Sequence, residues 1–245
     1  MLHSTGVFLL PPDYPTQRRQ FQIMARTIAI GDIHGCGISL DRLLENIDVT
    51  REDKIITLGD YVDRGMGSSQ VIETLINLVS KCQFVPLIGN HEIMMFKGLQ
   101  NGGKDLDFWM MHGGQATVAS YGGRLQNIPQ DHLTFLSHCL RFHETESHFF
   151  LHACYDPYLP LSEQPDEVVF WQHVKEFPPG QHMSEKTAIV GHTPQIDGEI
   201  LDLGHLKVID TYCYGDQWLT ALDVDSGKIW QANERGDFRT DQLPE

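Results

Sequence analysis

Positive charge is scarce in this chain of 245 residues. Lys and Arg together number 18, against 33 Asp and Glu, which gives a formal net charge of −15. Proteins that coat nucleic acid or bind anionic membranes present a basic face. We therefore expect neither nucleic acid nor a membrane as a partner. A phosphorylated substrate is still compatible with this composition, provided that bound metal supplies local positive charge.

Long apolar runs and paired cysteines are also missing. No apolar stretch approaches the roughly 20 residues that span a bilayer. The five cysteines are scattered and form no C-x-x-C pair, which favours reduced thiols and a cytoplasmic location over a disulfide framework. There is no internal repeat and no low-complexity tract. The composition, 41% hydrophobic and 21% charged, is that of an ordinary soluble globular protein.

Residues 1–23 differ from the sequence that follows. The apolar stretch at 7–10 is too short for the core of a signal peptide, and Pro11 and Pro12 end it. Met24 stands two residues before a clean strand pattern. We expect Met24 to be the natural start, residues 1–23 to be a flexible extension, and residues 24–245 to form a single domain.

Strand and helix patterns alternate from residue 26 onward. Short apolar runs predict strands over 27–30, 54–58 and 84–88, and leucine and isoleucine spacing predicts helices over 39–47, 68–79 and from 91. Residues 99–148 read as mostly helical or irregular. Further strands are predicted over 149–152, 187–190, 206–209, 218–224 and 228–230, with a hairpin turn at 223–227. This order predicts parallel β-α-β units, followed by a β-rich end, in two sheets packed face to face with outer helices.

Five of the predicted strands end in residues that can carry chemistry. Three successive strands end in glycine followed by a polar residue, and two later strands deliver a histidine. In α/β sheets, ligands bind beyond the carboxyl ends of the strands. Each of these residues alone has an ordinary structural explanation, such as a turn, a helix cap or a core histidine. Their joint arrangement favours one shared site, made of Asp32, His34, Asp60, Asn90, His152 and His192.

This mixture of oxygen and nitrogen donors suits divalent Mn, Fe or Zn better than Ca or Mg. Six protein ligands are too many for one catalytic ion with an open position, but they suit two ions that share one carboxylate. Two such ions bring a charge of +4, and Asp32 and Asp60 return −2. The remaining positive charge would attract a phosphate group, even in an acidic chain.

The run GDIHG…GDYVDRG…GNHE…LHA…GHT resembles the phosphoprotein phosphatase family of calcineurin-like metallophosphoesterases, in its bacterial and phage branch. The resemblance implies a four-layer α/β/β/α sandwich of two mixed sheets, with one catalytic domain over residues 24–245. It implies phosphomonoester hydrolysis by in-line attack of a metal-bridging hydroxide. Manganese is the expected metal, with Fe and Zn as alternatives.

The resemblance also implies a role for each site residue. Asp32 and His34 would bind the first metal and Asp60 would bridge, while Asn90, His152 and His192 would bind the second, with Asn90 also close to the substrate phosphate. His91 would be the general acid, oriented by Asp63, and Arg64 would hold phosphate oxygens. The histidine supplies the proton that an alkoxide leaving group needs, and the arginine fork suits two oxygens.

One departure from the family pattern concerns phosphate binding. Family members usually carry a second arginine between the last two metal histidines, whereas residues 153–190 contain none. His173 or Lys175 is the expected substitute. Cys36 and Cys154, next to the motifs, are expected to be small buried fillers rather than a redox pair.

Several residues are expected to serve structure rather than chemistry. We expect Trp109, with four methionines, to form a packing surface, and four histidines to be surface or rim residues. Either Tyr212 or Tyr214 is expected to line the cleft by resemblance. The methionines are Met94, Met95, Met110 and Met111, and the histidines are His132, His138, His143 and His148.

The expected substrate is phosphoserine or phosphothreonine in a protein or peptide, because Asp63 and Glu92 are typical of protein phosphatases. Hydrolysis of a dinucleoside polyphosphate such as diadenosine tetraphosphate, or of small phosphates generally, is the alternative. A silent module that only binds phosphorylated partners is disfavoured, since every metal ligand and His91 are present. The sequence carries no indication of oligomeric state.

Overall fold

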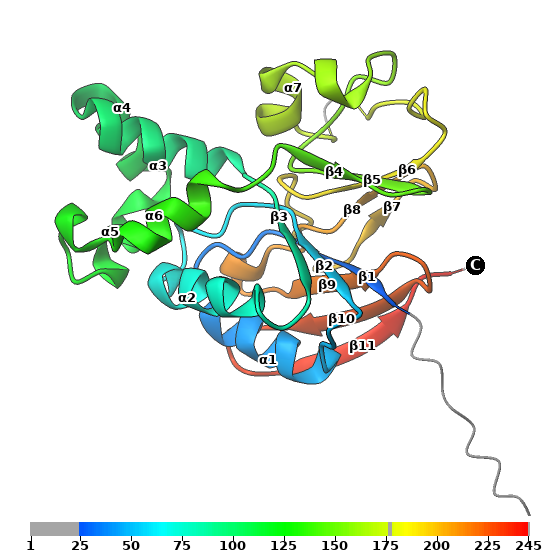
Figure 1. Cartoon of the computed structure of the whole chain (residues 1–245), viewed down its shortest axis with the longest axis horizontal. Helices are drawn as coiled ribbons and strands as arrows, with labels where there is room; N and C mark the ends of the chain where they lie inside the picture. The colour runs from blue at the N-terminus through cyan, green and yellow to red at the C-terminus, as the bar shows by residue number, and fades with distance from the viewer. Residues whose placement is uncertain (1–24, 176–177, 245) are drawn as a thin grey trace, which may run out of the picture.

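The computed structural model describes residues 25–175 and 178–244, and the predicted boundary at Met24 lies outside these residues. Two mixed β-sheets stack face to face, with helices on their outer sides (Figure 1). The predicted two-sheet α/β fold is therefore confirmed. Seven α-helices lie in the described part of the chain: α1 (Gly37–Ile47), α2 (Ser68–Leu78), α3 (Asn90–Asn101), α4 (Gly103–Trp109), α5 (Gln115–Ser120), α6 (Gln130–Ser137) and α7 (Asp166–Trp171).

The first sheet has six strands, with β1 and β2 at its centre. β1 pairs in parallel with β2, and β2 with β3, whereas β1 pairs in antiparallel fashion with β9. In spatial order the strands are β11 (Phe238–Gln242), β10 (Lys228–Ala232), β9 (Leu219–Asp223), β1 (Thr27–Ile30), β2 (Lys54–Thr57) and β3 (Gln83–Pro86). The parallel pairs are joined by the crossover helices α1 and α2, as the alternating pattern predicts.

The second sheet has five strands and a parallel centre. β5 pairs with β6 and β6 with β8 in parallel, and the two edge strands are antiparallel. The order is β4 (Phe142–Glu144), β5 (His148–Leu151), β6 (Thr187–Val190), β8 (Leu206–Val208) and β7 (Leu201–Asp202). The sequence patterns did not predict three of the strands, namely β4, β7 and β11. Two of them have only two or three residues, and β11 is a largely exposed edge strand of sequence FRTDQ.

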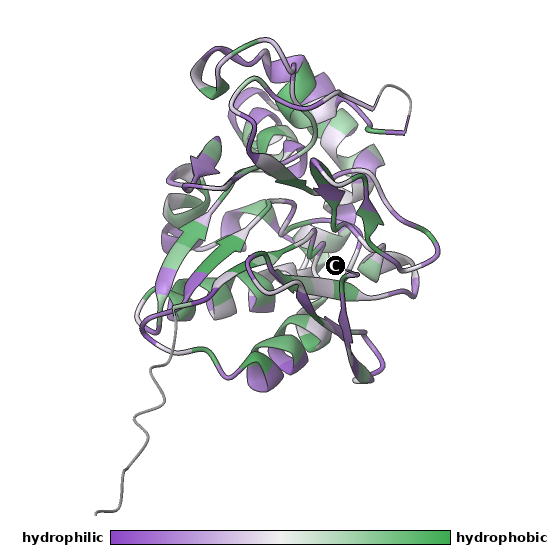
Figure 2. Cartoon of the chain, turned by 90° about the vertical axis from the view of Figure 1, so that its right-hand side faces the viewer, coloured by the Kyte–Doolittle hydropathy of each residue, from purple (hydrophilic) through white to green (hydrophobic). Residues whose placement is uncertain are grey.

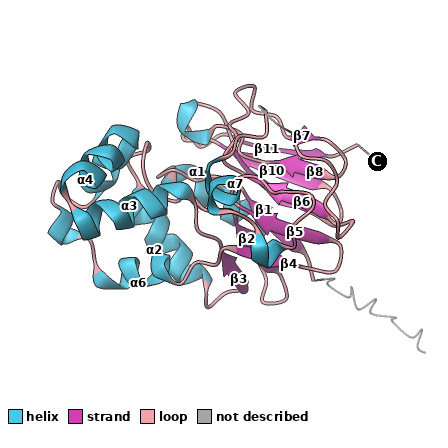
Figure 3. Ribbon diagram, turned by 90° about the horizontal axis from the view of Figure 1, so that it is seen from above, coloured by secondary structure: helices cyan, strands magenta, loops and turns pink. Residues whose placement is uncertain are grey.

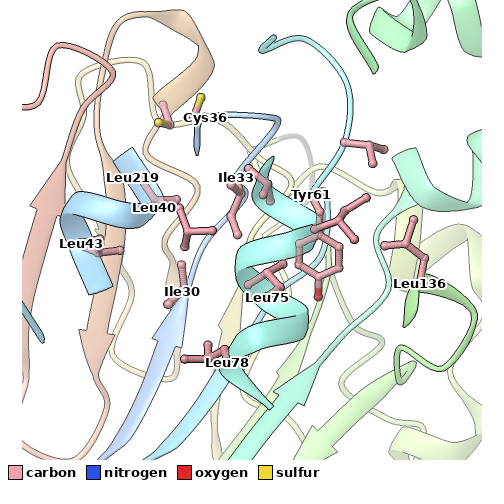
Figure 4. Close-up of a cluster of buried hydrophobic side chains, with 14 of the residues drawn as sticks. Ile30, Ile33, Cys36, Leu40, Leu43, Tyr61, Leu75, Leu78, Leu136 and Leu219 are labelled. Atoms are coloured by element: carbon pink, nitrogen blue, oxygen red, sulfur yellow. The ribbon is translucent and has the colours of Figure 1, made fainter. Parts of the chain in front are cut away.

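Three buried apolar clusters hold the layers together. One fills the space between the sheets and includes Ile56, Phe150 and Ile189. A second lies between the first sheet and the helices, where Leu40 and Leu43 of α1 and Leu75 of α2 pack with Tyr61 and other labelled residues (Figure 4). The third packs α7 on the outer face of the second sheet. In Figure 2 the inner strands are mostly hydrophobic, and the peripheral helices alternate in hydropathy.

The segment that connects the first sheet to the second, between β3 and β4 in the sequence, is largely helical, as expected, and contains α3 to α6 (Figure 3). Met94, Met95 and Trp109 are buried there, but Met111 is 82% exposed, against the prediction of a packing role. His132 is also not a surface residue: it is buried, and its Nδ1 lies 2.8 Å from the hydroxyl of Tyr121. Among the described residues, no helix is both long and apolar enough to cross a membrane.

A buried carboxylate ties the starts of the two central strands together. Asp53, before β2, accepts two hydrogen bonds from the guanidinium of Arg26, before β1, at 2.6 and 2.9 Å. It also accepts the backbone N–H and the hydroxyl of Thr50. Burial alone would raise the pKa of Asp53, but the bonds from Arg26 and Thr50 outweigh it and lower the pKa to about 2.

We expect Asp53→Asn to lower the free energy of unfolding by about 2 kcal/mol at pH 7. Because the folded-state pKa lies below that of the unfolded chain, this stability is present above about pH 4 and is lost as the pH falls toward 2. Urea unfolding of wild type and variant at several pH values checks both points. The exposed Asp107→Asn serves as the control. A gap between wild type and Asp53→Asn that stays constant down to pH 3 would contradict the assignment.

Candidate active site

The structure brings the predicted site residues to one edge of the sandwich, from both sheets. Asp32, Asp60 and Asn90 follow β1, β2 and β3 of the first sheet, and His152 and His192 follow β5 and β6 of the second. Side-chain donors converge in two groups that share one carboxylate. The first group is His34, Asp60 and His91, and the second is Asp60, His152 and His192.

Asp60 lies at the centre of this arrangement. Its carboxylate oxygens are 3.3 Å from Nε2 of His34 and 3.5 Å from Nε2 of His152, and one of them accepts the backbone N–H of His91. Burial opposes its ionisation, but the three neighbouring histidines hold the pKa of Asp60 well below its usual range. Asp60 is therefore an anion shared by both donor groups, which is the position that a bridging ligand needs.

Hydrogen bonds to backbone carbonyls fix the tautomers of two histidines. Nδ1 of His34 donates to the carbonyl of Val62 at 2.9 Å, and Nδ1 of His152 donates to that of Leu58 at 2.8 Å. Each ring thus turns the lone pair of Nε2 toward Asp60. Burial lowers the pKa of His34 to about 3 and also lowers that of His152. Neutral imidazoles held in this way are the form that binds metal.

Acceptor atoms meet in the site without a proton between them. The lone pairs of Nε2 of His34 and His152 face the carboxylate oxygens of Asp60 at 3.3 and 3.5 Å. The amide of Asn90 adjoins these groups in the orientation that satisfies hydrogen bonding, with its NH2 donating to Asp60 at 3.2 Å and to His152 at 3.0 Å. Within the described chain, Oδ2 of Asp210 is buried without a hydrogen-bond partner. A cation among these groups would offset their mutual repulsion. The donor set therefore fits divalent metal ions.

Asp32 is close to this site but is not in either donor group. Both of its carboxylate oxygens accept the backbone N–H of His192, at 3.1 and 3.0 Å. Burial, with the charges of Asp210 and Asp60, raises the pKa of Asp32 well above its usual range. A positive ion would offset the repulsion between Asp32 and the two nearby carboxylates. The metal-binding role expected of Asp32 stays a prediction. The small Gly191 makes room for it, because a Cβ there would lie 1.9 Å from Oδ1 of Asp32.

His91 and Asp63 form the expected pair. Nδ1 of His91 lies 2.7 Å from Oδ2 of Asp63, and both side chains are buried. Burial would lower the pKa of His91, but the charge of Asp60 and the contact with Asp63 outweigh it and raise the pKa above 6.5. The ring is thus held in one orientation and favours the protonated form, as a general acid requires.

Two residues that the sequence did not single out for the site hold Asp63. The indole N–H of Trp109 is 2.9 Å from both carboxylate oxygens, and the hydroxyl of Thr117 donates to Oδ1 at 2.6 Å. The same hydroxyl accepts the backbone N–H of Asp63. Trp109 was expected only to pack. Because it comes from α4 and Thr117 from α5, no local motif could have shown these contacts.

Glu92 fixes the two loops that carry Asp60 and Asn90. Its buried carboxylate accepts the backbone N–H groups of Gly89, Asp60 and Tyr61 at 2.8–2.9 Å, and that of Val62 at 3.3 Å. Burial and the charge of Asp60 raise the pKa of Glu92 to about 7, although the backbone donors oppose this. Glu92 therefore positions the site from beneath and does not face a substrate.

Arg64 is an exposed cation beside His34. Its Nη1 is 3.0 Å from Nε2 of His34, and its guanidinium lies over the ring of Tyr214 at 4.2 Å. Tyr214 is thereby the tyrosine beside the cleft. The backbone of Arg64 is left-handed, with φ of +68°, as is that of Asp63 with +74°. Such strained conformations cluster at functional sites, where the surrounding structure holds them.

The two candidates for the missing arginine lie on the other side of the site. The ring of His173 stacks on that of His192, with centroids 4.5 Å apart. Lys175 is exposed, and its Nζ donates to the carbonyl of Pro194. Their roles in substrate binding stay predictions. Cys36 and Cys154 are buried, as expected of filler residues.

We expect Trp109→Phe to reduce kcat for an alkyl phosphate about tenfold, because it removes a hydrogen bond to the anion that orients His91. The loss for p-nitrophenyl phosphate should be smaller, since that leaving group needs less protonation. Steady-state kinetics of both substrates check this. In a His91→Asn background the same substitution should have no further effect. Equal losses in both backgrounds would mean that Trp109 acts through packing alone.

Comparisons with known proteins agree with this geometry. Residues 25–217 match the profile of the calcineurin-like phosphoesterase family. A symmetrical bis(5'-nucleosyl)-tetraphosphatase of Salmonella arizonae is 27% identical over 175 residues, covering 70% of this chain and 45% of that protein. The enzyme of the same name from Cellvibrio japonicus is 41% identical over 68 residues, covering 27% of this chain and 24% of that protein. The chain thus spans less than half the length of these relatives.

Solved structures share the fold at low identity. One described as a diadenosine tetraphosphatase superposes with a TM-score of 0.64 at 19% identity, covering 91% of this chain and 96% of that one. The cold-active protein-tyrosine phosphatase of a Shewanella species superposes with a TM-score of 0.60 at 14% sequence identity, covering 89% of this chain and 80% of that one.

The expected activity on phosphoserine and phosphothreonine is wrong, since several relatives with similar sequence carry the name of dinucleoside tetraphosphatases. The structure explains the error. Asp63 is buried beneath Trp109 and Thr117, and Glu92 is buried beneath two loops, so both shape the site without reaching the substrate. Residues of this kind do not report on substrate identity.

The match over residues 25–217, the two stacked sheets and the cluster of metal-binding side chains at their shared edge lead to one conclusion. The chain belongs to the calcineurin-like phosphoesterase family and has the fold of a metallophosphoesterase hydrolase.

Proposed function

We propose that this protein hydrolyses dinucleoside tetraphosphates at the central phosphoanhydride bond. The observation that carries the proposal is the name that several of its relatives share, one of which aligns over 70% of the chain. In the reaction, a water oxygen forms a bond to one inner phosphorus atom, and the bond from that phosphorus to the central bridging oxygen breaks. Two nucleoside diphosphates result.

The residues of the site suit this reaction. A pair of bound divalent metal ions would supply charge neutralisation and an activated water molecule, held by Asp32, His34, Asp60, Asn90, His152 and His192. Arg64, exposed at the edge, would bind the phosphate oxygens of the chain. His91, kept protonated by Asp60 and Asp63, would donate a proton to the departing oxygen. Manganese is the metal we propose, with iron or zinc as alternatives.

We also propose a cytoplasmic location. All five cysteines are free, two of them, Cys36 and Cys213, buried near one another beneath the site. Free thiols suit a reducing compartment.

The substrate assignment is tested with the full chain loaded with Mn²⁺. We expect kcat/KM for diadenosine tetraphosphate to exceed that for a phosphothreonine peptide by at least tenfold, because the relatives are named for that substrate. Chromatography of the products should show ADP alone. A mixture of ATP and AMP would contradict the symmetrical cut, and preference for the peptide would overturn the proposal.

We expect His91→Asn to lower kcat for diadenosine tetraphosphate by roughly 10²-fold, and for an alkyl phosphate by up to roughly 10⁴-fold. The difference arises because a nucleoside diphosphate leaves as a stable anion, whereas an alkoxide needs the proton. Kinetics on both substrates, with metal content measured by elemental analysis, check this. Similar losses on both substrates with metals retained would remove His91 as the proton donor.

A further inference from the structure

A pocket lies beside the candidate active site, between the helices α3, α4 and α7. It has a volume of about 350 Å³ and is lined by Met94 and Lys97 of α3, Asp105 and Phe108 of α4, and Trp171 of α7. Helix α7 and the pair α3 and α4 are seen around the same end of the sandwich in Figures 1 and 3. We call this hollow the aromatic pocket.

The aromatic pocket adjoins the catalytic residues through two of its walls. The backbone carbonyl of Trp171 lies 3.3 Å from Nε2 of His192, a member of the metal-binding cluster. Met94 is three residues after His91 on α3, and residues at this spacing share one side of a helix. The pocket therefore begins about one helical turn from the proposed proton donor.

The lining is unusual for a solvent-exposed surface. Phe108 is 48% exposed and Trp171 37% exposed, although aromatic rings of this size are normally buried. Met94 gives the pocket an apolar wall, while Lys97 and Asp105 add one hydrogen-bond donor and one acceptor at its rim. Exposed aromatic rings with few polar groups are the means by which proteins bind the flat face of a nucleobase.

Size and charge make the aromatic pocket a better nucleotide site than a second pocket elsewhere on the protein. A volume of about 350 Å³ lies at the lower end of the range for small-molecule sites, which suits one base rather than a whole dinucleotide. Another pocket, larger and between α1 and α2, is lined by three carboxylates against one lysine, Lys81; the carboxylates are Asp41, Glu45 and Asp48. Those carboxylates would repel a polyphosphate. The aromatic pocket is therefore the better candidate for a nucleotide.

We propose that the aromatic pocket binds the base at one end of a dinucleoside tetraphosphate, with the base stacked on Phe108 and Trp171. The proposal rests on the proposed function and names the part of the chain that selects a nucleotide over a simple phosphate. Phosphates bound by Arg64 at the site would lead the ribose and base toward α3 and α4. Lys97 at the rim would then lie close to the phosphate next to the ribose.

The test measures binding as well as turnover, with Phe108→Ala and Trp171→Ala in the full, Mn²⁺-loaded chain. Titration calorimetry compares ADP with pyrophosphate, which has the phosphates but no base. We expect wild type to bind ADP at least tenfold more tightly than pyrophosphate, and each variant to lose most of that preference, in line with about 1–3 kcal/mol per stacked base. The ratio of kcat/KM for diadenosine tetraphosphate to that for p-nitrophenyl phosphate should fall about tenfold in each variant.

Two further variants guard against indirect effects. Tyr158→Ala removes another exposed aromatic residue, outside the pocket and 84% exposed, and should leave the ADP preference unchanged. Trp171→Phe keeps a stacking ring and should restore most of the preference lost in Trp171→Ala.

The outcomes separate this proposal from the proposed function. If wild type prefers ADP and the preference depends on Phe108 and Trp171, the pocket is supported, even where diadenosine tetraphosphate is not cleaved. If diadenosine tetraphosphate is cleaved to ADP but both variants match wild type in binding and in the kcat/KM ratio, the pocket proposal is overturned and the function stands. Equal binding of ADP and pyrophosphate by wild type also overturns the pocket.

Discussion

The carboxylate of Glu92 is the contact on which the geometry of the site depends. It gathers backbone N–H groups from the loop after β2 and from the loop after β3, and so fixes Asp60 beside the first residues of α3. Asn90 and His91 begin that helix, so one buried carboxyl group places the shared carboxylate, the amide of Asn90 and the imidazole of His91 relative to one another. Each N–H that it accepts would otherwise be buried without a partner, which is costly.

The site divides its work between two kinds of structure. The strand ends of both sheets hold the groups that suit phosphoryl chemistry, and these groups are rigid because their carbonyl and carboxylate partners are buried. The helices α3 to α6 lie to one side of the sheets, and α7 covers the second sheet; two exposed aromatic residues, Phe108 and Trp171, lie on α4 and α7. In α4 the two roles meet in neighbouring residues: Trp109 points inward to Asp63, and Phe108 lines the aromatic pocket. Chemistry and selectivity can thus change separately in such a fold.

The parts of this protein that were predictable from its sequence are those encoded locally. The strands that precede Asp32, Asp60 and Asn90 are short apolar runs followed by glycine, so their positions and their shared edge follow from pattern alone. The contact of Trp109 with Asp63 joins residues 46 positions apart, so no local sequence pattern predicts it. The edge strand β11 is mostly polar, so it lacks the alternation that marks a strand. Substrate choice was misjudged because Asp63 and Glu92 are buried supports of the site.

The pairing of β1 with β9 has a consequence for biosynthesis. Ile30 lies opposite Ala221, so the strand that leads to Asp32 is bordered on one side by a strand made almost two hundred residues later. Until that segment leaves the ribosome, β1 has an unpaired edge and the first sheet is incomplete. Contacts so distant in sequence slow folding and leave apolar strands open to association with other chains. During translation, the apolar strand β1 is therefore exposed along one edge for longer than a strand whose partners are both close in sequence.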